Sequence, residues 1–222
     1  RAGAIARALG ASGFEVELLS GGPPLADIEL GRARLTQLPP AHVADASFRP
    51  LRGESGAPVD ASWRARRRDL VLQRFRDFAP DAVITELYPF GRRALEFELD
   101  PLIAAVAAAR PRPLLLASLR DILVAPRERT KIAAALSRAR DYDRFLVHGD
   151  AGFLPLEASY PAARELGERL VYTGYVLGPL GPKPPGDIGR DEVLVSAGFG
   201  AVAERLFQVA FKARPLSAER GR

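Results

Sequence analysis

Glu86, Asp121 and His148 are the side chains best suited to chemistry in this sequence, because each lies at or just beyond the end of a short apolar run. A carboxylate or a neutral imidazole can remove a proton from a substrate hydroxyl, so each residue is a candidate general base. The alternative for each is a structural role, as an ion-pair partner or a hydrogen-bonded histidine. The residues alone do not rank the three.

The turn that follows Glu86 holds further candidates. Arg92 and Arg93 open the next predicted helix, where positive charge opposes the helix dipole, so they are not placed there for helix stability. We expect them to pair with Glu86 or to hold a ligand anion. Tyr88 lies in the same turn, and we assign it to substrate binding together with the two arginines.

The residues beside Asp121 and His148 extend both groups. Arg120 is expected either to form a structural salt bridge with Asp121 or to lower the pKa of that carboxyl as a catalytic base. Gly149 permits a close backbone approach beside His148, and Asp150 is expected to cap the following segment or to orient the imidazole. We assign Arg120 and Asp150 to substrate binding.

The last candidate is a turn of small residues at 196–201, between a predicted strand and a predicted helix. Backbone N–H groups at the start of a helix bind phosphate, which makes Ser196, Gly198, Gly200 and Ala201 candidates for phosphate binding. The turn does not match the dinucleotide-binding glycine pattern, and no P-loop lysine follows it. The sequence also has no nucleophile-elbow serine motif.

The elements that position these residues alternate between strand and helix. Apolar runs predict strands at 14–19, 33–38, 82–85, 113–118, 144–147, 170–172 and 192–196. Helical periodicity predicts helices at 2–10, 61–78, 92–109, 127–140, 162–168 and 202–212. Within the third helix Pro101 is expected to cause a split or a kink, and residues 39–59 predict a long loop.

This alternation predicts an α/β fold, a Rossmann-like parallel sheet with helices on both faces. Right-handed crossovers place the carboxyl ends of all the strands at one edge of the sheet. Ligands of such sheets bind beyond that edge. We therefore expect Glu86, Asp121 and His148 to lie near one another.

The chain is expected to hold one domain and the start of another. Residues 1–173 form the first domain, and 174–190 form a linker rich in proline and glycine. Residues 191–222 then supply the first strand and helix of a second Rossmann-like domain. The sequence has no methionine and starts within a helical pattern, so we expect it to be a fragment.

Composition excludes several classes of function. The 222 residues include 32 Lys and Arg, 27 Asp and Glu, two histidines and no cysteine. Disulfides and thiolate chemistry are therefore excluded, no metal site is expected, and no apolar run is long enough for a membrane-spanning helix. The basic cluster at 64–68 predicts a solvated helix face, with anionic lipid or nucleic acid as alternative contacts; a nucleic-acid partner is not expected.

Several strings of the chain resemble a family of predicted bacterial glycosyltransferases with the two-domain GT-B architecture. They are TELYPFGRRALEFEL, LASLRDILV, LVHGD, YTGYV and VLVSAGFGA, in that order. The family is related to glycosyltransferase family 28 and to MurG, the N-acetylglucosaminyltransferase of peptidoglycan synthesis. The likeness extends over most of the chain, and TELYPFGRR and SLRDIL are its most specific parts.

The resemblance implies a hexosyltransferase that moves a sugar from a nucleotide-sugar donor, UDP-linked, to an acceptor, with no cofactor. The first domain then binds the acceptor, either lipid-linked or a small molecule, and the second binds the donor. The turn at 196–201 is similar to the family's glycine-rich loop at the donor diphosphate, with Phe199 where the family has glycine. The implied location is the cytoplasm, with peripheral contact to the inner face of the membrane.

The resemblance also implies that two pieces of the family's fold are absent from this sequence. A first strand with a glycine-rich, histidine-containing loop precedes the first helix in the family, and an acidic residue for the donor ribose follows the position of Arg222. The fragment alone is therefore expected to be inactive. The alternatives are a GT-B nucleotide-sugar epimerase or hydrolase, and a non-catalytic nucleotide-sugar binding protein.

Overall fold

The computed structural model of the chain describes residues 1–24, 28–43, 51–178, 193–196 and 202–216. Two compact units are present. One comprises Arg1–His42 and Pro50–Gly178, and the other comprises Val43–Arg49 and Pro179–Arg222. The predicted linker at 174–190 lies mostly outside the described residues.

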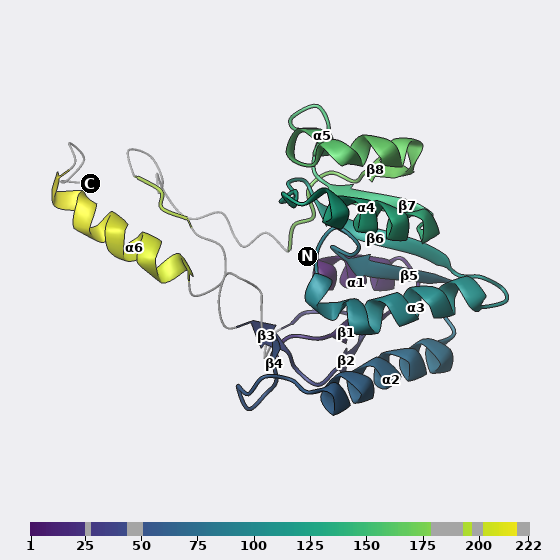
Figure 1. Cartoon of the computed structure of the whole chain (residues 1–222). Coiled ribbons are helices and arrows are strands. Elements are labelled where there is room, and N and C mark those ends of the chain that lie inside the picture. The colour runs from purple at the N-terminus through teal and green to yellow at the C-terminus, as the bar shows by residue number, and fades with distance from the viewer. Residues whose placement is uncertain (25–27, 44–50, 179–192, 197–201, 217–222) are drawn as a thin grey trace. The chain divides into compact units, whose positions relative to one another are not determined.

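The first unit is built on a four-stranded parallel sheet in the order β5-β6-β7-β8 (Figure 1). The strands are β5 (Ala82–Glu86), β6 (Leu114–Arg120), β7 (Arg144–His148) and β8 (Leu170–Tyr172). All three pairings are parallel, so the carboxyl ends of the four strands lie at one edge. The predicted parallel α/β sheet is confirmed, together with the order of its strands and helices along the chain.

Helices flank this sheet and provide its crossovers (Figure 1). The α-helices are α1 (Ala2–Ala11), α2 (Ala61–Phe78), α3 (Glu96–Ala108), α4 (Arg129–Arg138) and α5 (Leu156–Ser159). The 3-10 helices are η1 (Arg93–Leu95), η2 (Ala139–Asp141) and η3 (Pro161–Arg169). Helix α2 has the predicted bounds because the Asp60 carboxylate accepts the Trp63 N–H at 2.7 Å and Ala79 ends the helix in a left-handed conformation.

A second, smaller parallel sheet consists of β1 (Glu17–Ser20) and β2 (Arg34–Gln37). Both strands were expected from the alternating apolar residues. The segment predicted as a long loop contains two further short strands, β3 (His42–Val43) and β4 (Leu51–Arg52). Backbone hydrogen bonds between Gly53 and Ala57 and between Leu51 and Val59 close a compact turn there, which the sequence pattern did not show.

The centre of the four-stranded sheet is covered on both faces. Successive residues of a strand point to opposite faces, and Ala117, Ser118 and Leu119 of β6 are all at most 2 % exposed. Aromatic rings pack over the same region: Phe90 lies 5.7 Å from Phe145 and 5.2 Å from the ring of Tyr160. Such pairs add about 0.5–1.5 kcal/mol each beyond the burial of their area.

Three local features differ from the prediction. Helix α3 is not split at Pro101, because a proline removes only one backbone hydrogen bond and the rest of the helix packs against the core. The helix predicted at 162–168 is present as the 3-10 helix η3, interrupted at Gly167. Residues 193–196 form no strand, and Leu194 is 88 % exposed, because no described strand pairs with them.

The basic cluster at 64–68 is not wholly a solvated face. Arg64 and Arg66 are exposed as predicted, but Arg67 is 1 % exposed. Its guanidinium makes a bidentate pair with Glu98 of α3, at 2.6 and 3.0 Å, and the remaining Nη1 donates to two backbone carbonyls beyond β1 and β2. Burial raises the pKa of Glu98, and Arg67 opposes that rise. The sequence prediction failed because Arg67 falls on the same helix face as Val71.

The second unit contains α6 (Val202–Ala213), at the predicted position, followed by the 3-10 helix η4 (Arg214–Leu216). Large apolar side chains of α6 are exposed, among them Phe211 at 74 %. In the described part of the chain, no helix combines the length and apolar character needed to cross a membrane.

Candidate functional site

Polar side chains from the ends of all four strands join in one series of hydrogen bonds at the carboxyl edge of the sheet. Ser118 Oγ donates to Glu86 Oε2 at 2.9 Å and also lies 2.9 Å from His148 Nε2. On the other side of the imidazole, Nδ1 lies 2.7 Å from Thr173 Oγ1. We call Glu86, Ser118, His148 and Thr173 the strand-end chain.

The register of the strands explains why these four side chains meet. Glu86 is paired with Ser118 across β5 and β6, and Ser118 is paired with Leu146 across β6 and β7. His148 is two residues beyond Leu146, so its side chain points to the same face of the sheet as Ser118. Thr173 follows β8, and its N–H continues the ladder by donating to Val147 O at 3.0 Å.

The strand-end chain is buried in the middle and open at both ends. Ser118 is 2 % exposed and His148 is 6 % exposed. The side chain of Glu86 is 29 % exposed, and Thr173 is exposed. A ligand can therefore reach Glu86 and Thr173, whereas the serine and the imidazole between them are shielded from water.

Charges around His148 favour the neutral imidazole. Burial lowers its pKa, and so does the positive charge of Arg1, whereas Glu86 acts in the opposite direction. Arg1 also forms an ion pair with Glu86. The site therefore combines an ion-paired carboxyl group with an imidazole whose pKa is lowered.

Asp121 borders the strand-end chain without joining it. A side chain at Gly149 would come within 2.5 Å of the Asp121 Cβ, so the turns after β6 and β7 are in direct contact and require glycine there. The Asp121 carboxylate accepts the N–H of Ile122 at 3.0 Å. Its charge is thus beside the site, but its oxygen is engaged with its own turn.

Asp150 shapes the turn after β7 instead of orienting the imidazole. Its carboxylate accepts the Gly152 N–H at 2.8 Å, and its carbonyl accepts the N–H groups of Phe153 and Leu154. The residue itself is exposed. The imidazole of His148 is oriented by Thr173, which the sequence did not suggest.

The three predicted arginines are not drawn into ion pairs at the site. Arg92, Arg93 and Arg120 are all exposed. Among the described residues, the ion-pair partner of Glu86 is Arg1, and no salt bridge joins Arg120 to Asp121. The expected pairing of Glu86 with Arg92 or Arg93 is therefore not observed, and the positive charge of Arg93 instead acts on Glu128 and Tyr160.

Tyr88 is separated from the other predicted residues by its burial. It is 0 % exposed, and its hydroxyl donates to Asp100 of α3, which also binds Arg138. Burial and the neighbouring Asp100 raise the pKa of Tyr88 above its usual value. This arrangement joins the turn after β5 to α3 and α4, which is a structural contact.

The donor-side candidates lie in the second unit. Ser196 is exposed, whereas Gly198, Gly200 and Ala201 lie outside the described residues. Ser118 and Thr173 complete the strand-end chain and were not among the predicted site residues. A small hydroxyl residue inside a strand, or directly after one, gives no signal in a single sequence; only the register reveals its partners.

Two hollows in the described part of the first unit lie away from the strand-end chain. One, of about 260 Å³, lies against Asp100, Ile103 and Arg138. The other, of about 570 Å³, is lined by Trp63, Arg66 and the turn that precedes α2. The described residues contain no group of three or more acidic or histidine side chains able to hold a metal ion.

Comparisons of the chain with protein-family models, with curated proteins and with solved structures return no match. The fold is therefore described as a mixed α/β unit with a four-stranded parallel sheet flanked by helices, consistent with a Rossmann-like fold.

Proposed function

We propose that the protein containing this chain is a GT-B glycosyltransferase that moves a sugar from a UDP-linked donor to an acceptor hydroxyl, independently of metal and with inversion at the anomeric carbon. The observation that supports this most is the strand-end chain at the carboxyl edge of a parallel sheet, the edge at which such sheets bind ligands. The family resemblance supplies the substrate class.

Sugar transfer requires a base, because an acceptor hydroxyl is a poor nucleophile until its proton is removed. General-base assistance typically contributes about 10²–10⁴-fold to the rate. Glu86 and His148 belong to one hydrogen-bonded unit that reaches solvent, whereas the Asp121 carboxylate is engaged with the Ile122 N–H. Glu86 and His148 are therefore better placed for the proposed base than Asp121.

The departing nucleotide diphosphate needs positive charge or N–H donors. Helix α6 starts at Val202, and Gly198 and Gly200 come shortly before it in the sequence; the N-terminus of a helix favours phosphate. In the first unit, Arg92, Arg93 and Arg120 have exposed guanidinium groups. These residues are the proposed anion-binding groups of the two units.

The acceptor is proposed to be a lipid-linked or small molecule, with the enzyme in the cytoplasm and in peripheral contact with the membrane. Exposed arginines on α2, among them Arg64 and Arg66, are the candidate contacts for anionic lipid. Sedimentation with vesicles of anionic lipid tests this part. Binding that persists unchanged in the Arg64→Glu, Arg66→Glu double variant would refute it.

The proposed activity is tested by measuring UDP release from UDP-sugars with and without a pool of acceptors. We expect Glu86→Gln and His148→Ala to lower kcat by about 100-fold with little change in the KM for the donor. Arg110→Ala is the control, because this exposed arginine binds only carbonyls at the end of its own helix.

Three outcomes contradict the proposal in different ways. Wild-type rates in Glu86→Gln, Asp121→Asn and His148→Ala would exclude all three bases. Donor consumption without any acceptor would indicate an epimerase or a hydrolase. Calorimetric binding of nucleotide sugars with no turnover for any acceptor would indicate a binding protein.

A further inference from the structure

The hydrogens of the strand-end chain can be assigned by counting donors. Ser118 Oγ has one hydrogen and two partners, Glu86 Oε2 and His148 Nε2, both at 2.9 Å. When Glu86 is ionised it only accepts, so the serine hydrogen points to it and His148 must donate from Nε2. A neutral imidazole then has a bare Nδ1, which accepts the hydroxyl hydrogen of Thr173 at 2.7 Å.

A second assignment fits the same atom positions. With a proton on Glu86, the carboxyl group donates to Ser118, the serine donates to His148 Nε2, and Nδ1 donates to Thr173. The Thr173 hydroxyl then turns to another acceptor, and two carbonyls are available: Gly174 O at 3.1 Å and Val147 O at 3.4 Å. The two assignments differ by one proton and by hydroxyl rotation, with no movement of heavier atoms.

We propose that the strand-end chain is a proton relay that takes up a proton at Thr173 and delivers it to Glu86. This inference rests on the proposed glycosyl transfer and names the side chain that meets the acceptor hydroxyl. The carboxyl group of Glu86 gives the relay its direction, because it is the acidic group of the chain and receives the proton. A ligand can reach Thr173 at the other end, whereas Ser118 and His148 are too enclosed to touch it.

The transfer is balanced at each atom. The acceptor O–H bond breaks as Thr173 Oγ1 takes its proton, and the former Thr173 proton moves to His148 Nδ1. The Nε2 proton moves to Ser118, and the serine proton moves to Glu86 Oε2. These proton transfers occur in one concerted step, which leaves the acceptor as an alkoxide and Glu86 as an acid. The alkoxide forms a bond to the anomeric carbon as the bond from that carbon to the diphosphate of the donor breaks and UDP leaves, so nothing is oxidised or reduced.

The imidazole remains neutral throughout this sequence, which suits its surroundings. The charged groups that act on His148 are Glu86 and the guanidinium of Arg1. Burial and Arg1 disfavour an imidazolium, so a step that never creates one avoids that cost. In the relay Thr173 is catalytic, because it touches the substrate, whereas Ser118 and His148 act through their neighbours.

Nitrogen-15 NMR of the two histidines tests the relay in the chain without any substrate. At neutral pH we expect His148 to carry its proton on Nε2. Ser118→Ala removes the acceptor of that proton, so we expect the Nδ1–H tautomer, which Thr173 accepts while donating to Gly174 O. His42 has no hydrogen bond to the strand-end chain. Unchanged resonances of His42 therefore indicate that a variant keeps the wild-type fold.

Variants of the exposed end keep the inference falsifiable if Ser118→Ala does not fold. Thr173→Val is expected to shift the Nδ1 resonance of His148, because its hydroxyl donor is lost, and Thr173→Ser is expected to restore it. An Nδ1–H tautomer in the wild type, or no change in either Ser118→Ala or Thr173→Val, overturns the relay.

Kinetics then separate the relay from the proposed function. We expect kcat to fall by about 10–100-fold in Thr173→Val and to recover to within about 3-fold of wild type in Thr173→Ser. Expected tautomers without sugar transfer by the wild type would refute the proposed function alone. Sugar transfer with unexpected tautomers would refute the relay alone.

Discussion

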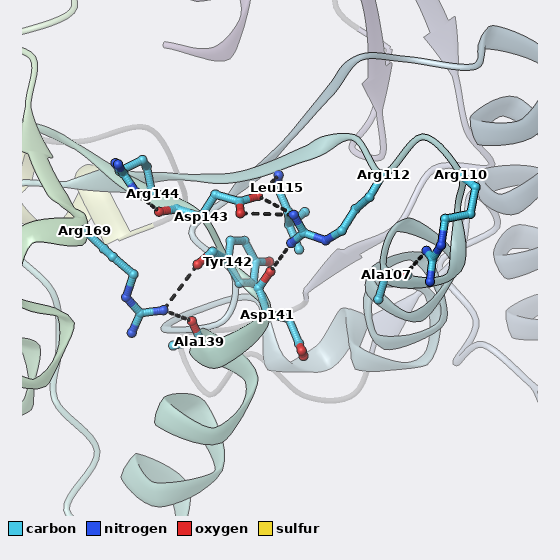
Figure 2. A network of polar contacts seen from close by, with 10 residues as sticks. All are labelled: Ala107, Arg110, Arg112, Leu115, Ala139, Asp141, Tyr142, Asp143, Arg144 and Arg169. Atoms are coloured by element: carbon cyan, nitrogen blue, oxygen red, sulfur yellow. Dashed lines mark hydrogen bonds and ion pairs between the residues drawn. The ribbon is translucent and has the colours of Figure 1, made fainter.

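The two edges of the four-stranded sheet use polar residues in opposite ways. At the amino edge, Arg112 binds both oxygens of Asp143, at 3.0 and 3.1 Å, and the carbonyl of Asp141 at 2.9 Å (Figure 2). Asp143 in turn accepts the backbone N–H of Leu115 at 2.7 Å. Two of these four contacts join a side chain to the backbone, and the ion pair between Arg112 and Asp143 connects the start of β6 to the start of β7.

A second arginine completes the amino edge. Arg169, at the end of η3, donates to the carbonyls of Ala139 and Tyr142 (Figure 2). Its guanidinium also lies 5.4 Å from the centre of the Phe145 ring. At the carboxyl edge, by contrast, side chains bind one another, and each hydroxyl has more than one partner. The amino edge therefore fixes the backbone, and the carboxyl edge holds protons that can be exchanged.

The largest stability effect is expected at the carboxyl edge of the smaller sheet, where both members of an ion pair are buried. Arg67→Leu leaves the Glu98 carboxylate buried without its partner. We expect the free energy of unfolding in urea to fall by about 3–5 kcal/mol. Arg66→Leu, exposed on the same helix, should change it by less than about 0.5 kcal/mol. Equal losses of unfolding free energy in the two variants would contradict the larger effect expected of the buried arginine.

The next effect tests the amino edge of the larger sheet. Asp143→Asn removes the charge that pairs with Arg112 and weakens the acceptor of the Leu115 N–H. We therefore expect the free energy of unfolding in urea to fall by about 2 kcal/mol. Asp141→Asn is the matched control, because only its backbone carbonyl is used in this network. If the Asp143→Asn variant were as stable as the wild type, the structural role of this edge would be contradicted.

The pH dependence of that effect sharpens the comparison. Burial opposes the charge of Asp143, but the Leu115 N–H and Arg112 outweigh it, so the pKa of Asp143 lies below its usual value of 3.8. A lowered pKa in the folded state stabilises the protein above about pH 4, and this contribution disappears as pH falls through the folded-state pKa. The stability difference between wild type and Asp143→Asn should therefore shrink below pH 3.8; a constant difference in acid would contradict it.

The smallest stability effect is expected at the carboxyl edge of the same sheet. Glu86 is partly exposed and its ion pair with Arg1 is screened by water, so Glu86→Gln should change the free energy of unfolding by only about 0–1 kcal/mol. The same variant is expected to abolish most of the proposed turnover. A loss of stability as large as that of Asp143→Asn would remove the distinction between the two edges.

Most elements of the fold could be predicted because their signals are local. The bounds of α2 follow from Asp60 as a cap and from the Ala79-Pro80 stop, and the runs that became β5 to β8 are short and apolar. Pro101 misled the prediction, since packing of α3 outweighs one lost hydrogen bond. Arg67 misled it as well, because arginine is seldom buried without a partner, and its partner Glu98 is distant in sequence.

The site was only partly predictable for a related reason. Glu86 and His148 could be found, since a polar residue at the end of a buried strand is conspicuous in the sequence. Ser118 and Thr173 could not, because their importance depends on which residue lies across each neighbouring strand. Pairing between parallel strands depends on crossovers of many residues, and no local pattern encodes it.

The contact between Gly149 and Asp121 has a mechanical consequence. Because the Asp121 Cβ occupies the space that a side chain at Gly149 would need, a larger residue at that position would have to displace one of the two turns. The turn after β7 continues directly from His148, so such a substitution would also disturb the hydrogen bonds of the imidazole.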